Sequence, residues 1–169
     1  MYLLLRKFTK LPLRRKLILV EALGNTSVAW FMINFVPYSI WKRWLGSPVS
    51  LTDISLEAPP PPAGSEDLKN IAWVHALLSR RMGKHFTCLM LGFSARAMLR
   101  RRGHRSLLVL GVGKTKEEAE KRLGAHAWII HNGYDIVGGS VRKDYTPVAA
   151  FGDWMKSDAS CNAVMPTKA

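Results

Sequence analysis

Two side chains in this sequence, Cys88 and His126, could together carry out nucleophilic chemistry. Cys88 directly follows Thr87, a residue type that commonly precedes the first turn of a helix. A thiol in that turn faces unpaired backbone N–H groups and the positive end of the helix dipole, which favour its reactive thiolate form. The same N–H groups could stabilise an oxyanion when the sulfur attacks a carbonyl.

His126 lies in the segment AHAW, on a predicted strand. An imidazole beside the thiol would accept its proton and later deliver it to a leaving amine. Each residue alone has a simpler explanation, because a free cysteine packs as a small hydrophobic residue and a histidine can pack beside Trp128. A cysteine that starts a central helix, followed by a histidine on an antiparallel strand, is however the chain order of papain-like and transglutaminase-like enzymes. The pair therefore predicts a cysteine-dependent acyl reaction.

The elements predicted around this pair form an α+β domain. Apolar residues at helical spacing predict a helix over Glu66–Met82 and a central helix from Cys88 to just before Gly103. The pattern then changes to that of strands, at Ser106–Val112, Ala125–His131 and Tyr134–Gly138, with a hairpin turn at Asn132-Gly133. Helices followed by a strand meander indicate a small antiparallel sheet. Beyond Arg142 the pattern is lost, so no further element is predicted.

Residues 1–46 are expected to form a basic helical unit of their own. The helical stretches are Leu3–Phe8, Leu13–Leu23 and Val28–Trp44, with Gly24 between the last two. The stretch from residue 28 is apolar nearly all round, which predicts burial on several sides. The Pro-rich residues 47–65 predict a stiff linker, so a catalytic domain would occupy residues 66–156 and a loose tail residues 157–169.

The apolar stretch from Leu17 to Val36 also has the length of a membrane span. Glu21, Asn25 and Asn34 interrupt it, and such groups are costly at the centre of a bilayer. A buried or surface-lying helix is therefore the expectation. The N-terminus is not expected to be a secretory signal, because its basic residues follow the apolar residues rather than precede them.

Composition excludes several classes of protein. The 169 residues are 48% hydrophobic and 22% charged, which excludes wholesale disorder, collagen and a disulfide scaffold. Only two cysteines occur, Cys88 and Cys161, which suits a reducing compartment and predicts a cytoplasmic protein. The net charge of +13 favours an acidic partner, but no nucleic-acid-binding module accompanies the basic clusters. An arginine cluster at the end of the central helix is expected to lie away from its packed face and includes Arg96, Arg100 and Arg102.

No cofactor or metal is predicted. GVGKT at Gly111–Thr115 resembles the end of a P-loop, but Leu108 stands where that motif needs glycine. His85, Cys88, His126 and His131 are ligand types for zinc. However, His126 and His131 are an odd number of residues apart on one strand and point to opposite faces.

Several motifs in combination, CLMLGFSARAMLRRRG, LLVLGVG and AHAWIIHNG, resemble the stand-alone leader peptidases of lasso-peptide biosynthesis, which are bacterial transglutaminase-like (papain-like) cysteine proteases. The resemblance is strongest over residues 66–140 and looser over RRKLILVEAL and IWKRWLG. It implies that Cys88 is the nucleophile and His126 the base. It implies removal of the leader from a ribosomal precursor peptide, so that a partner cyclase can close the macrolactam. It also implies a separate leader-recognition protein, expected to bind the basic helical unit.

The resemblance further implies an aspartate on the strand after the hairpin, which would orient His126. With a two-residue turn at Asn132-Gly133, His126 pairs with Gly139, so the expected position falls on Gly138 or Gly139. Neither of these residues carries a carboxylate.

Asp135 is the third candidate catalytic residue. It shares the face of His126 but is expected to pair with Ile130, about 13 Å along the strand at ~3.4 Å per residue, unless a bulge or a longer turn shortens that distance. A backbone carbonyl, a water or another acid such as Asp144 could hold His126 instead.

Two alternatives to the peptidase, and one addition to it, are left open. A transglutaminase-type acyltransferase would use the same Cys88–His126 pair without hydrolysis. A catalytically degraded site would leave a basic adaptor or scaffold protein. Membrane contact through residues 17–44 is compatible with the peptidase but less expected.

Overall fold

The computed structural model describes residues 11–51, 66–114 and 123–153. Its helices are α2 (Leu13–Phe35), α3 (Tyr38–Trp41), α4 (Glu66–Met82) and α5 (Cys88–Arg101), with 3-10 turns at Lys42–Leu45 (η1) and Gly139–Asp144 (η3). Its strands are β1 (Ser47–Val49), β2 (Leu107–Lys114), β3 (Leu123–His131), β4 (Tyr134–Val137) and β5 (Tyr145–Gly152). The predictions for residues 3–8 and 157–169 lie outside the described residues.

All strands belong to one antiparallel sheet with the order β1-β5-β2-β3-β4. The predicted hairpin between β3 and β4 is confirmed, with Asn132 and Gly133 at φ of 48° and 82°, the positive values that a tight primed turn requires. The predicted pairing of Ile130 with Asp135 is also confirmed. The register shifts directly after that pair, so Ile129 pairs with Val137. This bulge changes which residue of the returning strand reaches His126.

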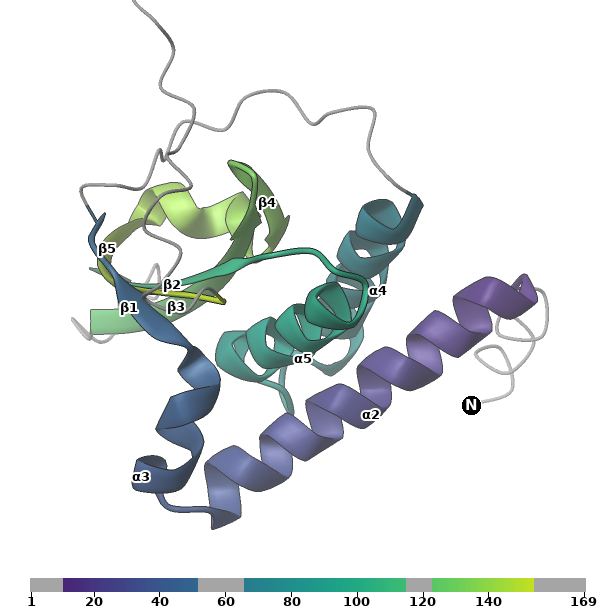
Figure 1. The fold of residues 1–169 in the computed structure, drawn as a ribbon, viewed down its shortest axis with the longest axis horizontal. Helices are drawn as coiled ribbons and strands as arrows, with labels where there is room; N and C mark the ends of the chain where they lie inside the picture. The colour runs from purple at the N-terminus through teal and green to yellow at the C-terminus, as the bar shows by residue number, and fades with distance from the viewer. Residues whose placement is uncertain (1–10, 52–65, 115–122, 154–169) are drawn as a thin grey trace, which may run out of the picture.

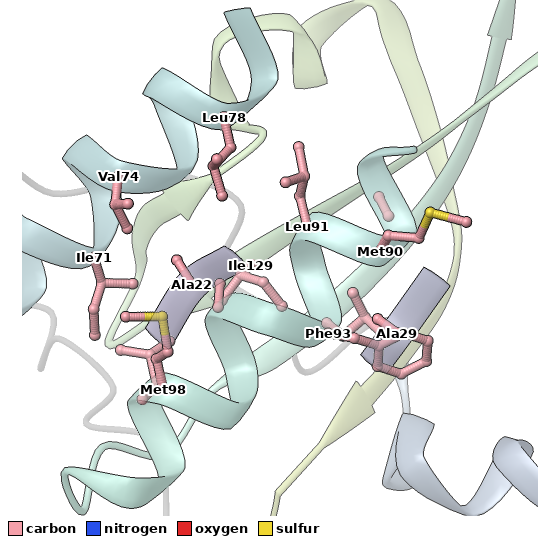
Figure 2. Packing of buried hydrophobic residues seen from close by; sticks show 14 of the residues in the cluster. Ala22, Ala29, Ile71, Val74, Leu78, Met90, Leu91, Phe93, Met98 and Ile129 are labelled. Carbon is pink, nitrogen blue, oxygen red and sulfur yellow. The ribbon is translucent and has the colours of Figure 1, made fainter. Parts of the chain in front are cut away.

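Helix α5 occupies the centre of the fold, as predicted. Thr87 caps its start and accepts a hydrogen bond from the backbone N–H of Met90, and Gly103 follows its end at a φ of 76°. One side of α5 packs on β3 and the other on α2 and α4 (Figure 1). Figure 2 shows this core, in which Ile129 from the sheet lies with side chains of the three helices: Ala22, Ala29, Ile71, Val74, Leu78, Leu91, Phe93 and Met98.

Helix α2 is continuous through Gly24, which corrects the prediction of two helices separated there. It packs against α5 and α4 within the same hydrophobic core, and Glu21 is bound by Arg101 and Arg102 of α5. The described part of residues 1–46 is therefore not a separate structural unit. The prediction that residues 28–44 are buried on several sides is also wrong, because the side chains of Phe31 and Phe35 are exposed.

Two strands were not predicted from the sequence. β1 lies within the expected linker and pairs with β5 at one edge of the sheet, where Pro48 is tolerated. β5 follows Arg142, where no further element is predicted. It lacks a hydrophobic pattern because only Ala150 and Gly152 of its residues are buried. Both strands are defined by pairing with distant residues rather than by an internal hydrophobic pattern.

Arg96 is buried, contrary to the prediction that it lies away from the packed face. Its Nε donates to Asp153 Oδ1 at 2.6 Å, and its Nη1 donates to the Leu45 carbonyl. The other oxygen of Asp153 accepts from the backbone and hydroxyl of Ser106 at 3.1 and 2.7 Å. Arg96 therefore joins α5 to the segments before β1 and after β5, because a buried cation requires a partner.

Candidate active site

Cys88 is the first residue of α5, and its half-buried side chain borders the hydrophobic core. The thiol is hydrogen-bonded with the His126 side chain and with the backbone N–H groups of Ala127 and Leu89. The structure thus brings together Cys88 and His126, the two residues that the sequence analysis paired. The thiol lies where both a base and backbone donors are within reach.

His126 is held by a backbone carbonyl. Its Nε2 lies 2.7 Å from the carbonyl oxygen of Gly138. Because a carbonyl oxygen only accepts, Nε2 carries a proton in this contact, and Nδ1 of the neutral ring is then the basic nitrogen. The ring also lies against two aromatic rings, with centroid distances of 6.0 Å to Trp128 and 5.0 Å to Tyr145. Contacts on several sides therefore restrict the orientation of the imidazole.

Gly138 can take this position because it has no side chain. Its φ is 79°, in the left-handed region, and it directly precedes η3. A Cβ on Gly138 would lie 2.7 Å from the carbonyl oxygen of Ala127 and 3.1 Å from His126 Nε2. The expected position of the orienting acid is thus a glycine whose carbonyl contacts the ring. A backbone carbonyl was one of the alternatives that the sequence left open.

Cys88 and His126 shift each other's pKa toward the charged pair. Burial raises the pKa of the Cys88 thiol, but the hydrogen bonds from His126 and from the Ala127 N–H outweigh it, and the pKa falls below its ordinary value. Burial lowers the pKa of His126, but the hydrogen bonds with Cys88 and the Gly138 carbonyl, together with the thiolate charge, raise it above its ordinary value. Both directions favour a thiolate beside an imidazolium, the reactive form of a cysteine nucleophile.

Asp135 does not contact His126 in this arrangement. Its Oδ1 accepts a hydrogen bond from Arg142 Nη1 at 2.9 Å, and Arg142 belongs to η3. Burial raises the pKa of the Asp135 carboxyl, and the charge and hydrogen bond of Arg142 oppose that shift. The expectation that Asp135 orients the imidazole is therefore corrected: it anchors η3, the turn that follows the Gly138 carbonyl. Beyond the bulge in the β3–β4 pairing, the residue that contacts His126 is Gly138, which follows β4, and not Asp135.

A cleft of about 810 Å³ opens beside the pair. α4 forms one wall, and β4 and η3 form the opposite wall, with Cys88 and His126 between them. Many of the residues that line the cleft are small or apolar, including Ala72, Ala76, Gly83, Phe86, Ile136, Val137 and Ser140. Such a cleft can accept an extended peptide segment whose carbonyl reaches the sulfur.

The other histidines are not brought to this pair as ligands. His131 contacts the Arg105 carbonyl at 2.5 Å and the ring of His104. His75 borders the cleft but is buried, and its ring nitrogens contact the Ile71 carbonyl and the Ser94 hydroxyl at 2.9 and 3.0 Å. Within the ranges that the structure describes, no three His, Cys, Asp or Glu side chains are grouped as a metal site.

Most of this chain matches a known protein family. The sequence model of the transglutaminase-like superfamily matches residues 29–150, which include Cys88, His126 and Gly138. The match begins within α2 and ends within β5, so it spans both sides of the expected linker. Searches of curated proteins and of solved structures found no match to the chain.

Proposed function

We propose, from the premise that this chain belongs to the transglutaminase-like superfamily, that it is a cysteine peptidase with Cys88 as nucleophile and His126 as base. The single observation that carries the proposal is the hydrogen bond between the Cys88 thiol and His126 beside an open cleft. The superfamily includes cysteine peptidases and acyltransferases, and either reaction needs this pair.

The reaction follows from the contacts. The Cys88 thiolate attacks the scissile carbonyl, and the oxyanion is stabilised by backbone N–H groups at the start of α5. His126 donates its Nδ1 proton to the amine nitrogen, the C–N bond breaks, and a thioester remains on the sulfur. His126 then removes a proton from water, whose oxygen attacks the thioester and releases the acid and the thiol. The Gly138 carbonyl keeps Nε2 protonated throughout and leaves Nδ1 as the nitrogen that exchanges the proton.

The proposed substrate is the junction between leader and core in a lasso-peptide precursor. This finer assignment is supported by the combined resemblance of CLMLGFSARAMLRRRG and AHAWIIHNG to stand-alone leader peptidases. It implies a separate leader-recognition protein that delivers the precursor and a cyclase that uses the freed core N-terminus. A cytoplasmic location is part of the same proposal, because ribosomal precursors are made there.

The test is cleavage of the precursor by the purified full chain with its recognition protein, followed by mass spectrometry. Cys88→Ala should abolish formation of leader and core fragments, whereas Cys161→Ala, which removes the other cysteine, should cleave as the unaltered chain does. Undiminished cleavage by the Cys88→Ala variant would end the peptidase proposal. Equal rates with and without the recognition protein would remove the delivery part alone.

The product mass separates hydrolysis from acyl transfer. With a primary amine added in excess, a peptidase yields the free carboxylate, whereas an acyltransferase yields the amide of that amine. A Cys88 thiol that alkylates no faster than an ordinary free cysteine would instead favour the basic adaptor.

The role of Asp135 is tested by Asp135→Asn. If Asp135 were the acid that orients His126, this change would lower the rate by orders of magnitude. We expect a much smaller loss, since the amide keeps a hydrogen-bonding oxygen for Arg142. A loss as large as that of His126→Ala would restore Asp135 as the orienting acid.

A further inference from the structure

The outer face of α2 carries a row of exposed apolar side chains. Leu17, Phe31 and Phe35 expose 62%, 55% and 63% of their surface, although they belong to a helix whose other face lies in the core. The row follows helical spacing along the whole helix and consists of Leu13, Leu17, Val20, Val28, Phe31 and Phe35. The buried row on the opposite face consists of Ile18, Ala22, Thr26 and Ala29. Helix α2 therefore has two apolar faces, and only one of them is covered by the described residues.

Further apolar side chains are exposed in the segment that follows α2 in the chain. Tyr38 and Ile40 of α3 and Trp44 of η1 are also exposed, and Trp30 of α2 is partly exposed beside Phe35. We call all these residues together the outer apolar surface. So many exposed large apolar side chains in one part of a folded protein indicate an interaction site.

Basic residues lie at both ends of the outer apolar surface. Arg14, Arg15 and Lys16 begin α2, and Lys42 and Arg43 lie in η1. Residues 1–51 contain eight Lys and Arg but one acid, Glu21. At the start of α2, Arg14 is paired with Asp67 and Glu66 of α4, and the Arg15 guanidinium lies over the Trp73 ring of the same helix. Glu21 is bound by Arg101 and Arg102 of α5, so it does not offset the charge of Lys42 and Arg43. The surface is thus apolar along its length and has two exposed cations, Lys42 and Arg43, at its η1 end.

The packing of α2 restricts how such a surface can be covered. By length and composition α2 could cross a membrane. Its inner face, however, packs against α5, and the Ser94 hydroxyl of α5 lies 3.1 Å from the Ala22 carbonyl. Crossing a bilayer would break these contacts and the Glu21 ion pairs. At 1.5 Å per residue the helix offers a row of roughly 33 Å that can lie flat on a surface instead.

The cleft stays open when the outer apolar surface is covered. Helices α4 and α5 lie between α2 and the sheet (Figure 1), and α2 contributes none of the described residues that line the cleft. A surface that bound α2 from outside would therefore not block access to Cys88.

We propose that the outer apolar surface docks this protein on an anionic lipid membrane, with α2 lying parallel to the bilayer plane. Aromatic and aliphatic side chains enter the boundary between headgroups and acyl chains, and the exposed cations Lys42 and Arg43 contact anionic headgroups. A second copy of this chain is a poorer occupant, since its outer face carries the same positive charge. This inference does not depend on the peptidase proposal, because it concerns a different face.

Flotation of the purified full chain with lipid vesicles tests the proposal. The protein should float with vesicles of equal phosphatidylcholine and phosphatidylglycerol, and much less with phosphatidylcholine alone. Replacing both Phe31 and Phe35 with serine should weaken vesicle binding at least about tenfold, because two large apolar contacts are lost. Val148→Ser, which alters an equally exposed residue on β5, should bind as the unaltered chain does. Circular dichroism checks that the variants keep their helix content.

Charge is tested separately. Replacing Lys42 and Arg43 with glutamine should weaken binding to anionic vesicles, and raised salt should do the same. Failure of the unaltered chain to float, or equal flotation of the serine variant, would overturn the proposal. A third outcome would also overturn the membrane proposal: the unaltered chain binds no vesicles, and the serine variant no longer binds a leader-recognition protein. That outcome would assign the outer apolar surface to a protein partner.

Discussion

The contact between His126 and the Gly138 carbonyl can be tested by replacing Gly138 with alanine. The new Cβ would lie 2.7 Å from the Ala127 carbonyl oxygen and 3.1 Å from His126 Nε2, so the loop must move away from the ring. A hydrogen bond to a charged group is worth about 1.5–3 kcal/mol. If the Gly138 contact stabilises the imidazolium in the transition state by that amount, kcat/KM for cleavage should fall about 10- to 150-fold.

Strain must be separated from loss of this contact. Alanine at a φ of 79° costs roughly 1–2 kcal/mol of stability wherever it occurs. Gly103 provides the matched control, since its φ is 76° and no atom lies within 4 Å of its ideal Cβ. Gly103→Ala should lower the thermal midpoint but leave kcat/KM within about twofold.

The assay is steady-state cleavage by both variants at a temperature where thermal melts show each to be folded. If Gly138→Ala cleaves within twofold of the unaltered chain, the carbonyl does not orient the base. If Gly103→Ala loses as much activity as Gly138→Ala, strain alone accounts for the effect.

Other predictions concern ionisation and stability. Alkylation of Cys88 by iodoacetamide should reach half its maximal rate below the pH of an ordinary thiol, about 8.5, and His126→Ala should move that midpoint upward; an unchanged midpoint would contradict the pairing. His75 is buried, and burial lowers its pKa from 6.5 to about 4, so the unfolded chain binds a proton between these pH values that the folded chain does not. Urea unfolding should therefore show stability falling by about 3 kcal/mol as the pH drops from 6.5 to 4, less so in His75→Leu, and a slope unaffected by that variant would refute the assignment. Asp153→Ala should destabilise the fold by about 3–5 kcal/mol in denaturant titrations, because it leaves the Arg96 cation buried without its partner. A loss of stability below about 1 kcal/mol would contradict this, since the guanidinium would then be solvated without Asp153.

The positions of Cys88 and His126 on their elements could be predicted because local signals specify them. Thr87 caps the helix that Cys88 begins, and Asn132-Gly133 defines the hairpin after the strand that carries His126. These signals act over a few residues, so they can be recognised without knowledge of the rest of the fold. Whether the two side chains are catalytic is still a prediction.

The group that holds His126 could be predicted only in part. Counting back from the hairpin turn places the position on Gly138 or Gly139, and Gly138 does contact His126, through its carbonyl. The contact lies beyond a bulge after Ile130 and Asp135 that shifts the register. A one-residue shift exchanges the faces of a strand, so the partner of His126 depends on a local irregularity without a clear sequence signal. Two consecutive glycines after Val137 were the available hint that backbone, not a side chain, approaches the ring.

The sequence by itself determined the central helix with Cys88 at its start, the strand with His126 and the hairpin, because capping, turn chemistry and hydrophobic period are properties of neighbouring residues. Only the tertiary structure decided that Gly138 holds His126, that Arg96 is buried, and that α2 shares the core while exposing a second apolar face. Those outcomes depend on which distant segments meet. Burial and pairing are set by the partner that covers a residue, and the spacing of residues along the chain does not specify that partner.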